Sequence, residues 1–161
     1  MKSFDQLVPE FERWKTRYPA GTESSLVLPC LRRLQEERGY VADEDIARLA
    51  SYLPVPPIQI EEVLSFYTQF RRAPVGTHHL QVCRNVSCSM RGSERLLARI
   101  RERLGVSPGE STADGRFTLD TVECLGSCGT APVLVVGESF HENMDPDQLD
   151  RLIASLQEGR P

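Results

Sequence analysis

The chain has 161 residues, of which 40% are hydrophobic and 26% are charged, so it is long enough to fold around a core without disulfides. Its 19 basic and 23 acidic residues leave a net charge of -4, which excludes the basic surplus typical of nucleic-acid-binding proteins. No apolar run approaches the ~20 residues of a membrane helix, and the first residues lack the pattern of a secretory signal. We therefore expect a cytoplasmic protein that does not insert into a membrane.

The first half of the chain is predicted to be helical. Apolar residues recur there at the helical period, and Pro or Gly marks the ends of the segments. The predicted helices lie at about residues 4–18, 24–39, 42–53 and 56–67. Residues 71–76, which include Pro74 and Gly76, are predicted to form a linker. We therefore expect an N-terminal helical domain at residues 1–76.

After Gly76 the periodicity changes to the alternation of strands, as at Leu80 and Val82. The predicted strands lie at about residues 78–83, 117–123, 133–136 and 139–142, and the predicted helices at about 92–104 and 145–156. The last helix begins with a capping box formed by Asp145 and Gln148. The order strand, helix, strand, strand, strand, helix is that of a thioredoxin-like domain, here residues 77–161. The expected fold class is α+β, a helical bundle followed by this domain.

Cysteines are the most informative residues of the sequence. Cys83 and Cys88 form a C-x4-C pair, and Cys124 and Cys128 form a C-x3-C pair. Without a secretory signal, such pairs indicate metal or redox chemistry rather than structural disulfides. Each pair begins where a predicted strand ends, and in a thioredoxin-like sheet these two strand ends can lie side by side. The four thiolates are therefore expected to converge. The fifth, Cys30, falls on an apolar helix face and is interpreted as a small core residue.

Three kinds of chemistry fit the two pairs. A [2Fe–2S] cluster needs four thiolates, and the preferred assignment puts Cys83 and Cys88 on one iron and Cys124 and Cys128 on the other. A structural four-cysteine zinc site is the main alternative. Thiol redox chemistry is the weakest, because no C-x-x-C motif is present. The spacing alone leaves these alternatives open.

Other polar residues give weaker signals. The three histidines, His78, His79 and His141, show no zinc or catalytic spacing. Arg84, inside the first cysteine loop, either points to solvent or raises the potential of a bound cluster through its positive charge. Four arginines recur along the helix predicted at residues 92–104: Arg91, Arg95, Arg99 and Arg103. A solvated face partly paired with nearby glutamates is the simpler interpretation of that row, and an interface for an acidic partner is the alternative.

Several motifs together closely resemble one known family. They are residues 80–83 (LQVC), 115–119 (GRFTL), 122–133 (VECLGSCGTAPV), 34–37 (LQEE), 39–41 (GYV) and 63–68 (VLSFYT). The chain resembles the small thioredoxin-like [2Fe–2S] subunit of respiratory NADH:quinone oxidoreductase, which has equivalents in NAD-linked hydrogenases and formate dehydrogenases. The resemblance covers about residues 18–156.

The resemblance implies that Cys83, Cys88, Cys124 and Cys128 hold one [2Fe–2S] cluster in a thioredoxin-like ferredoxin domain. It also implies a larger partner subunit that carries FMN, the NAD(H) site and a [4Fe–4S] cluster. This chain would then be a low-potential, one-electron carrier within an oxidoreductase, with no complete active site of its own. The alternatives are the same role in a hydrogenase or formate dehydrogenase, a zinc module whose helices mediate assembly, and a free-standing ferredoxin.

Overall fold

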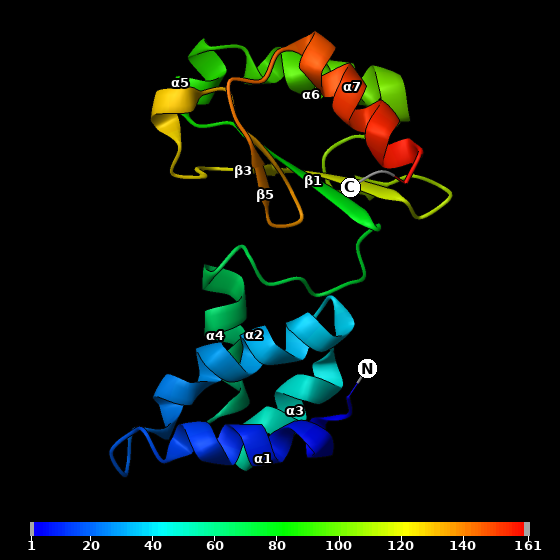
Figure 1. The fold of residues 1–161 in the computed structure, drawn as a ribbon. Coiled ribbons are helices and arrows are strands. Elements are labelled where there is room, and N and C mark those ends of the chain that lie inside the picture. Colours follow the sequence, from blue (N-terminus) through cyan, green and yellow to red (C-terminus); the bar gives the residue numbers. More distant parts are fainter. Residues whose placement is uncertain (1, 160–161) are drawn as a thin grey trace. The chain divides into compact units, whose positions relative to one another are not determined.

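The computed structural model describes residues 2–159 and divides the chain into two compact units, residues 1–74 and 75–161 (Figure 1). The first unit consists of helices, and the second combines a sheet with helices. The expected α+β class, with helices preceding a thioredoxin-like domain, is therefore confirmed. Residue 1 and residues 160–161, at the outer ends of the two expected domains, lie outside the described part of the chain.

The helical unit contains α1 (Phe4–Lys15), η1 (Glu23–Leu26), α2 (Val27–Arg38), α3 (Asp43–Tyr52) and α4 (Pro57–Phe66). These helices bury the apolar faces that the sequence pattern predicts, with Phe11, Leu31, Leu49 and Ile60 fully enclosed. Helix α2 ends at Gly39, whose φ of +85° is a conformation that other residues rarely adopt. The first helix ends at Lys15, three residues before its expected end at residue 18.

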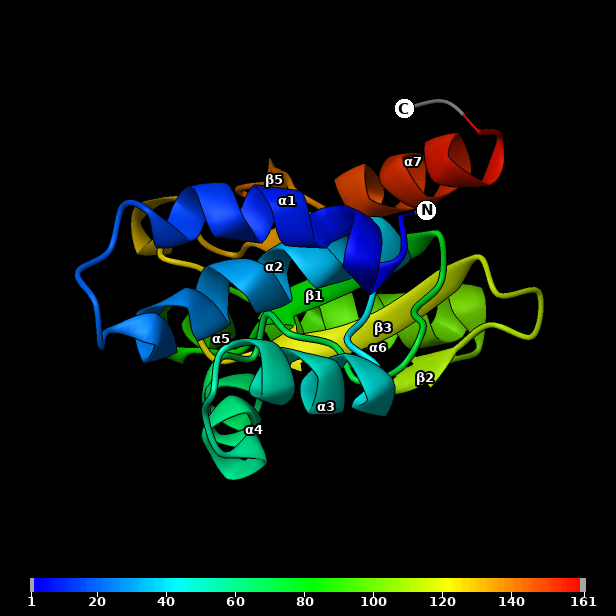
Figure 2. The ribbon, with the colours of Figure 1, turned by 90° about the horizontal axis from the view of Figure 1, so that it is seen from below.

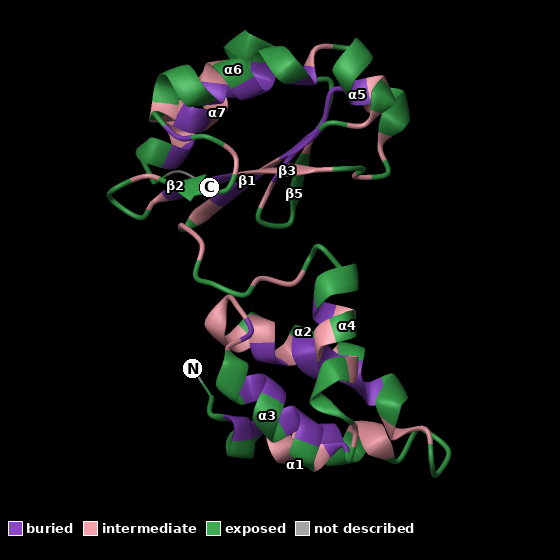
Figure 3. Cartoon of the chain, turned by 180° about the vertical axis from the view of Figure 1, so that it is seen from behind, coloured by how far each residue is buried: buried purple, intermediate pink, exposed green. Residues whose placement is uncertain are grey.

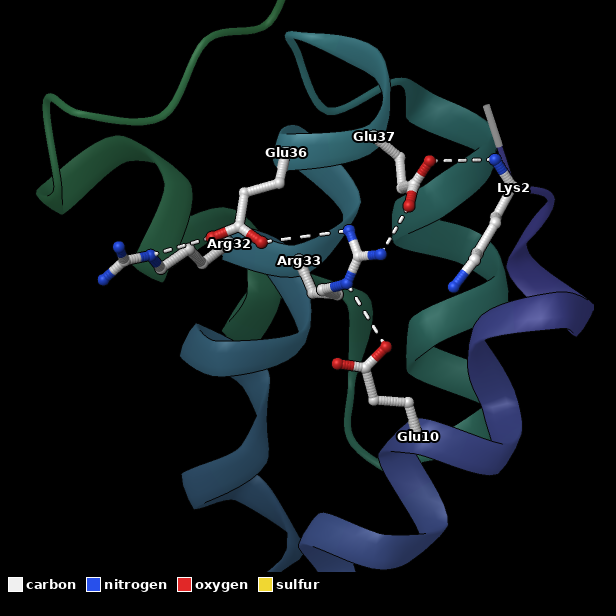
Figure 4. Close-up of polar contacts among 6 residues, drawn as sticks. All are labelled: Lys2, Glu10, Arg32, Arg33, Glu36 and Glu37. Carbon is white, nitrogen blue, oxygen red and sulfur yellow. Dashed lines mark hydrogen bonds and ion pairs between the residues drawn. The ribbon is translucent and has the colours of Figure 1, made fainter. Parts of the chain in front are cut away.

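Arg33 of α2 connects the first two helices through a group of carboxylates (Figure 4). Its Nε atom lies 3.2 Å from Glu10 of α1, and its other nitrogens pair with Glu36 and Glu37 on α2. The backbone N–H of Lys2 donates to Glu37 over 2.9 Å. This network holds the pKa of Glu37 below its usual value, through the Lys2 and Arg33 hydrogen bonds.

In the part of the chain that the structure describes, the second unit is built on a five-stranded sheet of order β2-β3-β1-β4-β5 (Figure 2). Its strands are β1 (His78–Cys83), β2 (Glu110–Ser111), β3 (Phe117–Val122), β4 (Leu134–Val136) and β5 (Ser139–His141). Strands β1 and β3 are parallel, whereas the other neighbours are antiparallel. The parallel pair matters most for function, because both of its strands end at the same edge of the sheet.

Two helices, α6 (Ser93–Leu104) and α7 (Pro146–Gln157), pack their buried residues against the sheet (Figure 3). The predicted capping box of α7 is present, with Asp145 accepting from the Gln148 N–H over 2.7 Å and the Gln148 side chain accepting from the Asp145 N–H. Arg99 of the arginine row pairs with Asp150 of α7 and with Glu102, so part of that row serves helix packing. No described helix is long and apolar enough to cross a membrane.

Gly76 marks a close approach between two backbone segments at the start of the second unit. A Cβ atom at this position would lie 2.8 Å from the backbone of Phe117, a distance that real Cβ atoms do not tolerate. The Gly76 N–H donates to the Thr118 hydroxyl over 2.6 Å. A glycine is therefore required for the chain to enter β1 beside β3.

Candidate metal centre

The first cysteine pair begins at the end of β1. The N–H of Cys83 donates to the Val133 carbonyl over 3.1 Å, and the next N–H, of Arg84, donates to the Val122 carbonyl over 2.9 Å. Cys83 is thus held between the end of β3 and the start of β4. Its thiol also contacts the Glu123 carbonyl at 3.7 Å, one residue before the second cysteine pair begins. The two strand ends lie side by side, as expected.

Cys88 is presented by a short helix, α5 (Val86–Met90), which the sequence pattern does not predict. The Asn85 side chain caps this helix by accepting from the Val86 N–H over 2.9 Å. The Ser89 hydroxyl donates to the Arg84 carbonyl over 2.7 Å. Five residues are too few for a helical period to be recognised, so Asn85, a residue type favoured at N-caps, is the signal that could have indicated it. The helix turns the Cys88 thiol back toward Cys83.

Both sulfurs of the first pair are buried. Cys83 and Cys88 are each 2% exposed and pack with Ala131 and Val133 in a small apolar cluster. Burial raises the pKa of the Cys88 thiol, and the side-chain hydrogen bond with Cys83 and the nearby Cys128 add to the rise. A metal cation would reverse this effect, because a coordinating thiol is deprotonated. The site is thus enclosed by apolar side chains on the side of the first pair.

The second pair lies on an exposed loop. Both Cys124 and Cys128 are exposed, and Cys128 begins the short helix η2 (Cys128–Thr130), which packs against α5. Between them, Gly126 adopts a φ of +77° and its N–H points at the Cys124 sulfur over 3.4 Å. A backbone N–H aimed at sulfur stabilises negative charge there, which favours a thiolate ligand.

The described residues, 2–159, contain no group of three or more His, Cys, Asp or Glu side chains already arranged around a metal position. Cys83 and Cys128 both lie near enough to Cys88 to raise the pKa of its thiol. Cys124 follows β3 at the same edge of the sheet. The structure therefore brings the two cysteine pairs to one edge of the sheet. Four thiols from two adjacent strand ends fit the donor set of a [2Fe–2S] cluster.

An ion pair joins the two cysteine loops. Arg84, which follows Cys83, pairs with Glu123, which precedes Cys124, at 2.8 to 2.9 Å. The two side chains are 55% and 73% exposed. Arg84 is therefore exposed to solvent, and its guanidinium also has a carboxylate partner. Sequence separation concealed this pair, since the partners lie on different loops.

The fifth cysteine and the three histidines are each at least partly buried. Cys30 is fully buried in the helical core, where burial raises the pKa of its thiol to about 12, so its interpretation as a core residue is confirmed. His79 places its Nε2 atom 2.6 Å from Asp120, and His78 packs on the ring of Phe117. His141 lies in β5, where burial lowers its pKa.

The arrangement defines a class: a thioredoxin-like sheet with cysteine pairs at the ends of its two parallel strands, preceded by a helical unit. Comparison with known proteins specifies it further. Residues 11–157 match the model of the thioredoxin-like [2Fe-2S] ferredoxin family, and the chain belongs to this family. The resemblance seen in the sequence is therefore confirmed.

Two relatives match nearly the whole chain, and both are subunits of NADH-quinone oxidoreductase. The relative from Rhizobium meliloti is 43% identical over 148 residues, which are 92% of this chain and 87% of the relative. The relative from Thermus thermophilus is 38% identical over 161 residues, or 99% of this chain and 89% of the relative. The similarity therefore spans both units.

Among solved structures, an NAD+-reducing [NiFe]-hydrogenase in the air-oxidized state matches with a TM-score of 0.70 and 24% sequence identity. The match covers 82% of this chain but 23% of the hydrogenase chain. At this identity the likeness concerns the fold, which includes part of the helical unit as well as the sheet unit.

Proposed function

We propose that this chain is the one-electron-transfer subunit of an NADH:quinone oxidoreductase and carries a low-potential [2Fe–2S] cluster. The observation that carries this conclusion is the similarity of nearly the whole chain to subunits of that enzyme, at 43% and 38% identity. The four thiols at one edge of the sheet supply the ligand set that this role requires.

The two cysteine pairs would hold the cluster from different parts of the fold. Cys83 and Cys88 would hold the cluster from a strand and a helix, and Cys124 and Cys128 would hold it from the exposed loop. The bound cluster supplies the capacity to accept and release one electron. The apolar contacts of Ala131 and Val133 exclude water on the side of the first pair. Four thiolates in such surroundings disfavour the addition of an electron, which gives a low potential.

A larger flavin- and NADH-binding iron–sulfur subunit is the proposed partner, within a complex on the cytoplasmic side of a membrane. The sequence contains no nucleotide-binding loop, so hydride chemistry belongs to another chain. Beside the cysteines, α5 exposes Val86 and Met90, which are 66% and 83% exposed. These side chains lie four residues apart, hence on one helix face, and are the proposed contact with the partner.

Anaerobic loading of the purified chain tests the cluster. With iron and sulfide, we expect both elements to bind in the ratio of a [2Fe–2S] cluster, a coloured protein, and a paramagnetic signal after one-electron reduction. The alternative of structural zinc predicts a colourless protein with one metal and no such signal. That outcome, with zinc bound in preference to iron, would overturn the proposal.

Co-expression with the flavin-binding subunit tests the partner. We expect a stable heterodimer through size exclusion, which Met90→Glu weakens by placing a charge in an apolar contact. The matched control is Phe140→Glu, which changes another exposed apolar residue on β5, away from α5 in the chain. Failure of the wild-type chain to remain with the flavoprotein would instead support a free-standing ferredoxin.

A further inference from the structure

Glu142 lies directly after β5 and contacts the loop that carries the second cysteine pair. Two hydroxyl groups of that loop donate to the same carboxylate oxygen of Glu142. The Thr130 hydroxyl does so over 2.7 Å, and the Ser127 hydroxyl also bonds to it. These hydrogen bonds hold the pKa of Glu142 below its usual value, so it is a carboxylate at neutral pH.

The segment that carries Glu142 is itself fixed. The N–H of Asn143 donates to the Thr130 carbonyl over 2.7 Å, and the N–H of Met144 donates to the Pro132 carbonyl over 3.1 Å. The Met144 side chain is 7% exposed and belongs to the core of the sheet unit. The carboxylate therefore reaches the loop from an anchored backbone, which is the geometry of a restraint rather than of a chance surface contact.

The loop that Glu142 contacts carries the exposed thiol of Cys128 and contains two glycines. Ser127 immediately precedes Cys128, and Thr130 is the last residue of η2, which Cys128 begins. The two contacts therefore fix the chain on both sides of one exposed thiol. Gly126 and Gly129 flank the same thiol and allow the loop wide conformational freedom. Fixing such a loop in advance reduces the entropy that ligand binding must remove.

We propose that Glu142 is a positioning residue of the metal centre, which holds Cys128 in the ligating conformation and keeps a negative charge beside its loop. This inference rests on the proposed function and deepens it. It has two separable consequences. The hydrogen bonds slow the loss of the metal, and a glutamine can retain them because its carbonyl oxygen also accepts. The charge opposes reduction, and a glutamine removes it.

The test compares Glu142→Ala and Glu142→Gln in the full iron-loaded chain, with Glu138→Ala as the matched control. Glu138 is an exposed carboxylate in the turn of the same hairpin. Two readouts are measured: the rate at which a chelator bleaches the cluster and the midpoint potential. We expect Glu142→Ala to release iron about tenfold faster, because two hydrogen bonds to an exposed carboxylate are lost. Glu142→Gln should stay within about twofold, whereas both variants raise the potential and the control changes neither readout.

Distinct results overturn the inference. Iron release at the wild-type rate from Glu142→Ala would exclude positioning, as would equally fast release from Glu142→Gln and Glu142→Ala. Should Glu142→Ala fail to fold, Thr130→Val removes one of the two hydrogen bonds to Glu142 and must also accelerate release. A wild-type chain that binds only zinc would overturn the proposed function, and zinc release from the same variants would still decide the role of Glu142.

Discussion

The two cysteine pairs of this chain are held in different ways. Cys83 and Cys88 belong to a strand and a helix, are each 2% exposed and pack in one apolar cluster. Cys124 and Cys128 belong to an exposed loop that contains a left-handed glycine. Secondary structure and apolar packing therefore position the first pair. The second pair depends on side-chain contacts of its loop.

A pair held by secondary structure binds a metal with little loss of conformational entropy, whereas an exposed loop must be ordered when it binds. An enclosed first pair and an exposed second pair also leave one side of the centre accessible for electron exchange with a partner.

The largest expected effect comes from removing one thiol of each pair. Cys83→Ala and Cys124→Ala should both abolish cluster binding, because each removes one of four ligands. The metal-free proteins should differ. Cys83→Ala leaves a cavity in the apolar cluster and should lower the free energy of unfolding by about 1 kcal/mol, whereas Cys124→Ala should leave it nearly unchanged.

Iron content and denaturant unfolding of the metal-free proteins measure these effects. Equal destabilisation by the two substitutions would mean that the second pair is packed as firmly as the first, and the contrast between the pairs would be lost.

The next prediction concerns backbone freedom in the second loop. Gly126 has a φ of +77° and open space around its Cα, so Gly126→Ala incurs strain without a clash. We expect a loss of about 1 kcal/mol in stability and slower uptake of iron. Gly129→Ala is the matched control, because Gly129 lies in the same loop with open space and without a left-handed φ. Both quantities are measured by denaturant unfolding and by the time course of visible absorbance.

Should Gly129→Ala cost as much as Gly126→Ala, the left-handed φ of Gly126 would not be the source of the loss in stability.

The sequence predicts a feature of this site only when the residues that form it lie close together in the chain. The cysteine pairs, their strand ends and the long amphipathic helices were all predictable, because each signal lies within one short segment. Helix α5 and strand β2 span five and two residues, too few to show a period. The contact of Glu142 with Thr130 joins residues 12 positions apart through the tertiary fold, and no local pattern indicates it.

A smaller effect should appear with pH. Glu142 has a lowered pKa in the folded chain, so its contribution to stability is complete above its usual value of 4.5 and is lost as the pH falls through its folded value. The metal-free wild type should therefore be more stable than Glu142→Gln at neutral pH, and the difference should vanish in acid. Asp114 and Asp150 also have lowered pKa values but are common to both proteins, so they cancel.

Thermal unfolding of the two metal-free proteins from pH 7 downward measures this difference. A gap that persists unchanged in acid would show that the glutamine is disfavoured for its shape, not for its missing charge.

The smallest effect concerns Arg84 and Glu123, which connect the two pairs. Both side chains are more than half exposed, so their ion pair should contribute under about 1 kcal/mol to stability. Their charges should still act on the cluster. Arg84→Gln leaves Glu123 unbalanced and should lower the midpoint potential, Glu123→Gln should raise it, and the double variant should return close to the wild type. High salt should reduce each shift, because exposed charges are screened.

Redox titration of the four proteins at low and high salt measures these shifts. If the double variant departed from the wild-type potential as far as a single variant does, the two charges would not offset each other at the cluster and the pair would be incidental. If the two opposite shifts cancel in the double variant, the pair acts as one neutral unit. Arg84 would then add no net charge beside the cluster, and Glu142, which contacts the second loop, would supply a fixed negative charge there.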